Sequence, residues 1–176
     1  MLFDAIAAPL ALLAVALPFL FAFTEPPVSN FWPLEMAWAC GAVLLLVGAG
    51  AAYAGSERPA RQRRWWAGVL AAGLALAAAV ASVIGLVQYV VGDVGLSPWI
   101  HASVPGQAVG NLRQRNQQGT LLSLGAWALL WWTLHGQPRL PGRGQAAWSG
   151  VWGRAVPVLA ALALVWMAVG GAATAS

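Results

Sequence analysis

Long apolar stretches without a charged residue constrain this chain more than any other feature. A transmembrane helix needs about 20 mainly apolar residues to cross a hydrocarbon core of roughly 30 Å. The composition agrees with that use, because 60% of the residues are hydrophobic and only 8% are charged. We therefore predict an all-α fold, a polytopic transmembrane helix bundle forming a single membrane domain over 1–176. The predicted spans are 5–23, 36–55, 65–91, 116–135 and 155–175.

The arginines predict how this bundle is oriented. All nine basic residues are arginine: four lie in the loop 57–64, three between 139 and 154, and only Arg113 and Arg115 lie on the opposite side. Cytoplasmic loops carry the excess of positive charge, so the N-terminus is expected in the cytoplasm and the two remaining arginines outside. The arginines sit in short loops rather than in a basic patch, so nucleic-acid binding is not expected despite the net charge of +4.

Residue patterns of soluble enzymes are missing. The chain has no lysine for a phosphate-binding loop, no paired His or Cys at metal-ligand spacing, and no nucleophile elbow. His101 and His135 each stand alone, and the single Cys40 has no partner for an internal disulfide. We predict no catalytic residue, no metal and no cofactor from these patterns.

Small residues recur every four positions in the third span, at Ala67, Ala71, Ala75 and Ala79. Small side chains at this spacing let two helices approach closely in lipid. This face is therefore predicted to pack against a neighbouring helix.

The segment 110–120 reads GNLRQRNQQGT, and it is the most polar part of the chain. It opens the fourth span, with Asn116 as the predicted N-cap, and backbone N–H groups at a helix start favour an anion. Guanidinium groups bind phosphate oxygens in pairs and stay charged, and buried amides need protein or water around them. The segment is therefore either a solvated loop or a phosphate site. The candidate substrate-binding residues are Asn111, Arg113, Gln114, Arg115, Asn116 and Gln117.

Spacing limits which of these side chains can act together. In a helix, Asn111 and Arg115 share a face, whereas Arg113 and Arg115 point apart. In an extended segment the two arginines share a side. One anion bound by both arginines therefore predicts a non-helical backbone up to about Arg115.

The run PGQAVGNLRQRNQQGTLLSLGAWALLWW resembles the segment that opens a membrane helix in bacterial O-antigen ligases and PglL-type protein O-oligosaccharyltransferases. Seven residues fit the pattern of that family, while Gly119 stands where alanine is common. The upstream VIGLVQYVVGDVGLSPWI is also similar to the helix end and outer loop before it. The residues that fit are Asn111, Gln114, Arg115, Asn116, Gln117, Thr120 and Leu122.

The resemblance implies a multi-pass glycosyltransferase of the bacterial inner membrane. Such enzymes take a glycan from undecaprenyl diphosphate at the periplasmic face and transfer it to lipid A core or to a protein hydroxyl. The reaction is regarded as metal-independent, with a periplasmic histidine as base and arginines on the diphosphate. That histidine lies in a later loop of the family, and His101 precedes the motif in a different loop. The chain is therefore expected to be the N-terminal part of such an enzyme and to be inactive alone. Membrane lipids are expected to surround it.

Two other functions stay open at this stage. A Wzy-type glycan polymerase shares the chemistry and differs in acceptor. A small membrane transporter or assembly subunit would need a polar path across the bilayer, and the spans 5–23, 36–55 and 155–175 contain almost no polar side chains.

Overall fold

The computed structural model describes residues 2–22, 31–54 and 59–135, and these residues form four helices and no strand. The helices are α1 (Leu2–Leu20), α2 (Phe31–Ala54), α3 (Pro59–Val91) and α4 (Arg115–His135). The all-helical prediction is thus confirmed for this part of the chain, and each of the first four predicted spans overlaps a helix. The predicted span 155–175 lies outside the described residues.

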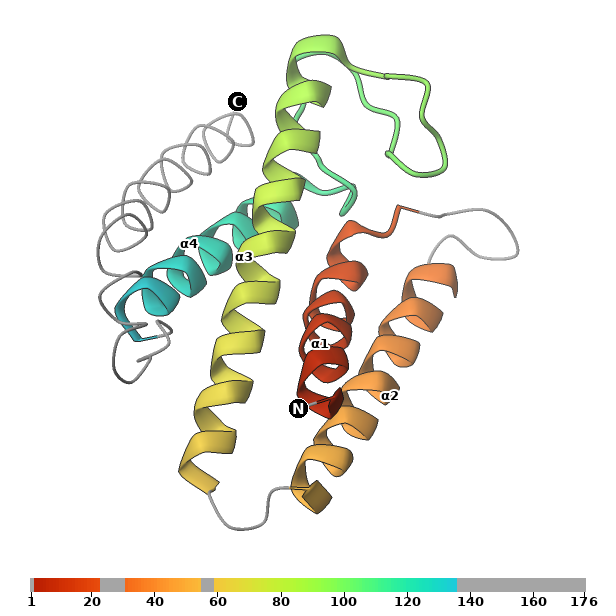
Figure 1. Cartoon of the computed structure of the whole chain (residues 1–176). Helices are drawn as coiled ribbons and strands as arrows, with labels where there is room; N and C mark the ends of the chain where they lie inside the picture. Colours follow the sequence, from red (N-terminus) through yellow and green to blue (C-terminus); the bar gives the residue numbers. More distant parts are fainter. Residues whose placement is uncertain (1, 23–30, 55–58, 136–176) are drawn as a thin grey trace.

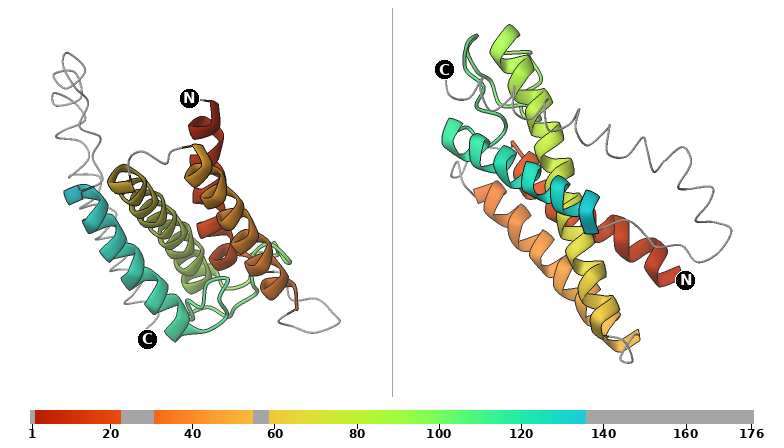
Figure 2. Two further views of the ribbon diagram at one scale, coloured as in Figure 1. Left: turned by 90° about the horizontal axis from the view of Figure 1, so that it is seen from below. Right: turned by 90° about the vertical axis from the view of Figure 1, so that its left-hand side faces the viewer.

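Helix α3 is the centre of the arrangement. It packs against α1 on one side and α4 on the other, and α2 packs against α1. Successive helices run in opposite directions, so the end of α1, the end of α3 and the start of α4 lie at the same end of the bundle (Figure 1). We call this the loop end, because the long connection 92–114 folds there. Seen from below, α3 again lies between α4 and the pair α1 and α2 (Figure 2, left).

Small side chains form the core at these helix contacts. One cluster, close to the loop end, joins alanines of α1 and α3 to two leucines of α4: Ala16, Ala77, Ala78, Ala81, Leu121 and Leu122. A second cluster joins α1, α2 and α3 through Ala7, Ala11, Val47 and Val69. Helices separated by alanine approach closely, which is how helix contacts are made where lipid supplies no hydrophobic driving force.

Among the four described helices, two are long and apolar enough to cross a membrane, judged by length and composition. They cover Pro33–Tyr53 in α2 and Arg63–Val91 in α3, while the apolar part of α1, Ile6–Leu20, is shorter. Many large apolar side chains on these helices are exposed, among them Leu45 and Leu46. Such surfaces suit a lipid environment rather than water.

The predicted small-residue face of α3 is only partly right. Ala71 is buried, but Ala67, Ala75 and Ala79 are only partly buried. The most buried alanines are Ala77, Ala78 and Ala81, because α3 contacts α1 and α4 on two sides and a single stripe cannot serve both.

Candidate functional site

The polar segment begins as a tight turn at the loop end of the bundle. Residues 111–113 form a turn and α4 starts only at Arg115. Gly110 and Arg113 both have a φ of 60°, in the left-handed region that a residue with a side chain rarely adopts. The backbone is thus non-helical before Arg115, as one anion bound by both arginines requires. A strained residue of this kind persists only where its surroundings hold it.

Gln88 of α3 is the first of three buried amides around this turn. It is 0% exposed. Its Oε1 accepts a hydrogen bond from the Gly110 backbone N–H at 2.7 Å, and its Nε2 donates to the His101 carbonyl at 2.8 Å and to the Gly110 carbonyl at 3.4 Å. One side chain thereby joins the helix to two separate parts of the loop.

Asn111 is the second buried amide, and it faces inward. Its Nδ2 donates to the Leu20 carbonyl at 2.6 Å and to the Trp99 carbonyl at 2.9 Å. Its Oδ1 accepts from the His101 backbone N–H at 3.2 Å. The side chain that was grouped with the substrate-binding residues thus ties the turn to the end of α1 and to the outer loop.

Gln118 of α4 is the third buried amide, again 0% exposed. Its Nε2 donates to the Ala81 carbonyl of α3 at 2.7 Å, and its Oε1 has no hydrogen-bond partner within the described part of the chain. Gly110 lies directly against this amide, so a side chain at position 110 would overlap it. The backbone passes here only because residue 110 is glycine.

The other candidate side chains lie on the turn and on the first turn of α4. Gln114, Arg115, Asn116 and Gln117 are exposed, and Arg113 is half-buried. Asn116 is not the N-cap that was predicted. Helix α4 begins one residue earlier because the Gln118 N–H already bonds to the Gln114 carbonyl at 3.0 Å.

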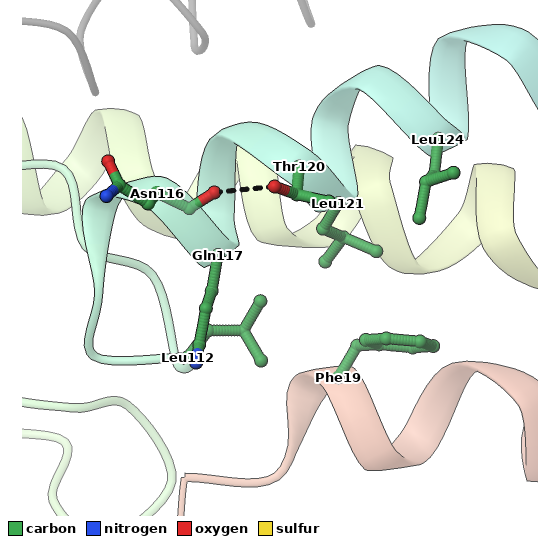
Figure 3. A pocket seen from close by; sticks show the side chains of 7 residues that line it. All are labelled: Phe19, Leu112, Asn116, Gln117, Thr120, Leu121 and Leu124. Atoms are coloured by element: carbon green, nitrogen blue, oxygen red, sulfur yellow. Dashed lines mark hydrogen bonds between the residues drawn. The ribbon is translucent and has the colours of Figure 1, made fainter.

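A pocket of about 420 Å³ adjoins this surface between α1 and α4. Asn116, Gln117 and Thr120 bring polar atoms to it, and the Thr120 hydroxyl donates to the Asn116 carbonyl at 2.8 Å. The remaining wall is apolar and is formed by Phe19, Leu112, Leu121 and Leu124 (Figure 3). Two of the six candidate residues therefore line one hollow, and Asn111 lies elsewhere.

His101 lies in the same connection as the turn, in the outer loop where the sequence places it. Its backbone bonds both to Gln88 and to Asn111. Burial lowers the pKa of His101, and the positive charge of Arg113 lowers it further. The imidazole is therefore neutral at pH 7, next to a permanently charged guanidinium.

Gln88, His101 and Gln118 were not among the predicted site residues. The sequence carries a signal for Gln88, because it is the one amide in the apolar stretch Arg63–Val91 of α3 and such a group must find a partner inside the protein. Across the described ranges, no three His, Cys, Asp or Glu side chains come together as a metal site would require.

The comparison with protein families points to the turn and to α4. Residues 108–133 match the model of the family described as protein glycosylation ligase, PglL_A. The match begins just before the turn and follows α4 almost to its end. No curated protein and no solved structure matches the chain. The likeness to a glycosylation ligase thus rests on the turn and the helix after it.

Proposed function

We propose that this chain is a membrane portion of a transferase that moves a glycan from undecaprenyl diphosphate to a protein hydroxyl. The observation that carries the proposal is that the family match, the two arginines and the pocket fall on the same stretch of the chain. The stretch that matches the protein glycosylation ligase family contains Arg113, Arg115 and six of the seven residues that line the pocket. Lipid A core remains the alternative acceptor, and the family description favours protein.

The arginines supply the charge that a diphosphate needs. Arg113 and Arg115 flank the point where the turn becomes helix, and guanidinium groups bind phosphate oxygens through paired hydrogen bonds. A diphosphate is also the leaving group of the proposed transfer. Positive charge held beside it would stabilise the negative charge that develops as the glycan departs.

The pocket supplies a place for the lipid. Its apolar wall of Phe19, Leu121 and Leu124 suits an isoprenoid chain, while Asn116 and Gln117 can hydrogen-bond to the polar end of the molecule. A lipid-linked glycan is both apolar and charged, so it needs these two kinds of surface side by side.

The proposed orientation places the loop end in the periplasm of a bacterial inner membrane, with the N-terminus in the cytoplasm and five spans in the whole chain. Arg63 and Arg64, both exposed, begin the membrane part of α3 at the opposite end of the bundle. That arrangement supports the proposal, because cytoplasmic ends carry more positive charge.

The proposal is tested by binding. The chain is placed in lipid nanodiscs and titrated with a fluorescent undecaprenyl-diphosphate disaccharide. Replacing both Arg113 and Arg115 by alanine should weaken binding at least tenfold, because a hydrogen bond to a charged group contributes about 1.5–3 kcal/mol.

The matched control replaces Arg63 and Arg64, a second exposed pair at the other end of the bundle, by alanine. This variant should bind the disaccharide lipid as the unmodified chain does. Equal binding by the Arg113 and Arg115 variant would remove the turn from the proposed donor site.

A further inference from the structure

We propose that Gln88 is the positioning residue of the arginine turn: its buried carboxamide holds the turn in the one backbone conformation that lets Arg113 and Arg115 bind the same diphosphate. The inference rests on the proposed function for the identity of the anion. It adds a residue of α3 that touches no ligand and acts through the backbone of the loop.

Both the oxygen and the nitrogen of the Gln88 carboxamide form hydrogen bonds. Its oxygen receives the Gly110 N–H, and its nitrogen donates to the carbonyls of His101 and Gly110. These partners lie 13 and 22 residues further along the chain. Because Gln88 sits in the last turn of α3, a rigid helix end fixes two distant points of the connection 92–114.

Arg113 needs such support. Its φ of 60° is unfavourable for a residue with a Cβ atom, so the turn does not hold this shape by local preference. Gln88 fixes the backbone at Gly110, where the turn begins, and Asn111 fixes the next residue to α1. Arg115, in contrast, belongs to α4 and keeps its place with the helix.

Loss of the Gln88 amide should therefore move one arginine and leave the other. The Gly110 N–H and the His101 carbonyl would lose a partner, and both would turn towards water to replace it. Arg113 would then leave its strained conformation. A diphosphate held by two arginines loses most of its affinity when one of them is displaced.

Gln118 offers a matched comparison. It is as buried as Gln88, but the only hydrogen bond of its side chain among the described residues goes to the Ala81 carbonyl of α3 rather than to the backbone of the loop. A glutamine that matters only because it is a buried amide should behave like Gln118. A positioning residue should not.

The test compares Gln88→Met with Gln118→Met, since methionine keeps the length of glutamine without its donors and acceptors. The intact chain is studied in nanodiscs, with inorganic pyrophosphate as the probe and isothermal titration as the readout. We expect Gln88→Met to weaken pyrophosphate binding tenfold or more and Gln118→Met to change it less than twofold. Both variants should lower the thermal unfolding temperature.

The imidazole of His101 provides a second readout that a loss of stability alone does not move. Burial and the charge of Arg113 both lower its pKa, so a loop that opens and carries Arg113 away in Gln88→Met should raise the pKa measured by NMR titration of the ring protons. Gln118→Met should leave it unchanged. If Gln88→Met does not fold, Gln88→Glu takes its place, because it keeps the acceptor for Gly110 and loses the donor to His101.

Three results would overturn the inference: full pyrophosphate affinity in folded Gln88→Met, an equal loss in Gln118→Met, or an unchanged pKa of His101. Failure of the proposed function looks different. In that case Arg113→Ala with Arg115→Ala binds pyrophosphate as the unmodified chain does, and the pKa of His101 in Gln88→Met alone decides whether Gln88 positions the turn.

Discussion

Glycine at position 110 allows the turn to pass the amide of Gln118, and this makes Gly110→Ala a sharp test at the scale of one residue. The variant would combine an unfavourable φ of 60° with overlap between the new methyl group and Gln118. We expect it to lower the free energy of unfolding by about 2–5 kcal/mol, the sum of backbone strain and overpacking.

Gly106 is the matched control for Gly110. It also has a positive φ, of 84°, but no atom lies within 4 Å of the position that a Cβ would occupy. Gly106→Ala should therefore cost only the backbone strain, about 1–2 kcal/mol. Equal unfolding temperatures for the two variants in detergent would contradict the close packing of Gly110 and Gln118.

The pKa of His101 reports on its two surroundings. Burial is the larger cause of its lowering and the charge of Arg113 the smaller. Arg113→Ala should raise this pKa, but not to the ordinary value of 6.5, because burial remains. NMR titration of the imidazole measures the change, and an unchanged value would place Arg113 away from His101.

The same lowering predicts how stability depends on pH. A histidine whose pKa is lower in the folded state stabilises the protein above its unfolded pKa, and this contribution is lost as pH falls from about 6.5 through the folded value. The thermal unfolding temperature in detergent should therefore fall below pH 6.5, and it should fall less in His101→Gln.

The six predicted site residues show what a sequence reveals at this scale. Their polarity in an apolar chain is visible at once, and the exposure of Gln114, Arg115, Asn116 and Gln117 agrees with a contact surface. The inward direction of Asn111 is not visible, because it depends on a turn with two left-handed residues. No periodicity of side chains predicts such a backbone.

Helices are the scale at which the sequence is most informative. The predicted span 116–135 differs from α4 by one residue at its start, because uncharged length and a polar boundary mark a helix directly. The face of a helix that packs against a neighbour is harder to predict from the sequence. The stripe from Ala67 to Ala79 was expected to pack, and the buried alanines are mainly Ala77, Ala78 and Ala81. A helix between two neighbours buries two faces, and sequence spacing does not say which neighbours exist.

The contact between α3 and α4 depends on Gly125, whose missing side chain leaves room for Ala78. Gly125→Ala would place two methyl groups in the same space and push the helices apart. We expect a loss of about 1–3 kcal/mol in the free energy of unfolding, the usual effect of overpacking.

Gly68→Ala is the control for this contact, because no atom lies within 4 Å of its added Cβ. Alanine is also the better helix former by roughly 0.5–1 kcal/mol, so this variant should be neutral or slightly more stable. Thermal unfolding of both variants in detergent gives the comparison. A stable Gly125→Ala would mean that α3 and α4 are further apart.

For the whole molecule, the proposed orientation places the loop end of the bundle in the periplasm. With Cys40 replaced by alanine, a new cysteine at exposed Ala102 should react with a membrane-impermeant maleimide in intact spheroplasts. A cysteine at exposed Arg64 should react only after the membrane is permeabilised. The opposite pattern would reverse the proposed orientation. The distribution of arginines predicts this orientation from the sequence, whereas the placement of the fifth span depends on residues beyond those described.

We propose that a lipid-linked glycan diphosphate binds where the turn meets α4, and photocrosslinking tests this binding site directly. An undecaprenyl-diphosphate glycan with a photoreactive group in the first isoprene unit is irradiated with the chain in proteoliposomes, and the adducts are located by mass spectrometry. We expect adducts between Leu112 and Leu124 and at Phe19, and all of them should be lost when excess unlabelled donor is added. Adducts spread along α2, or adducts at the pocket that unlabelled donor does not remove, would contradict it.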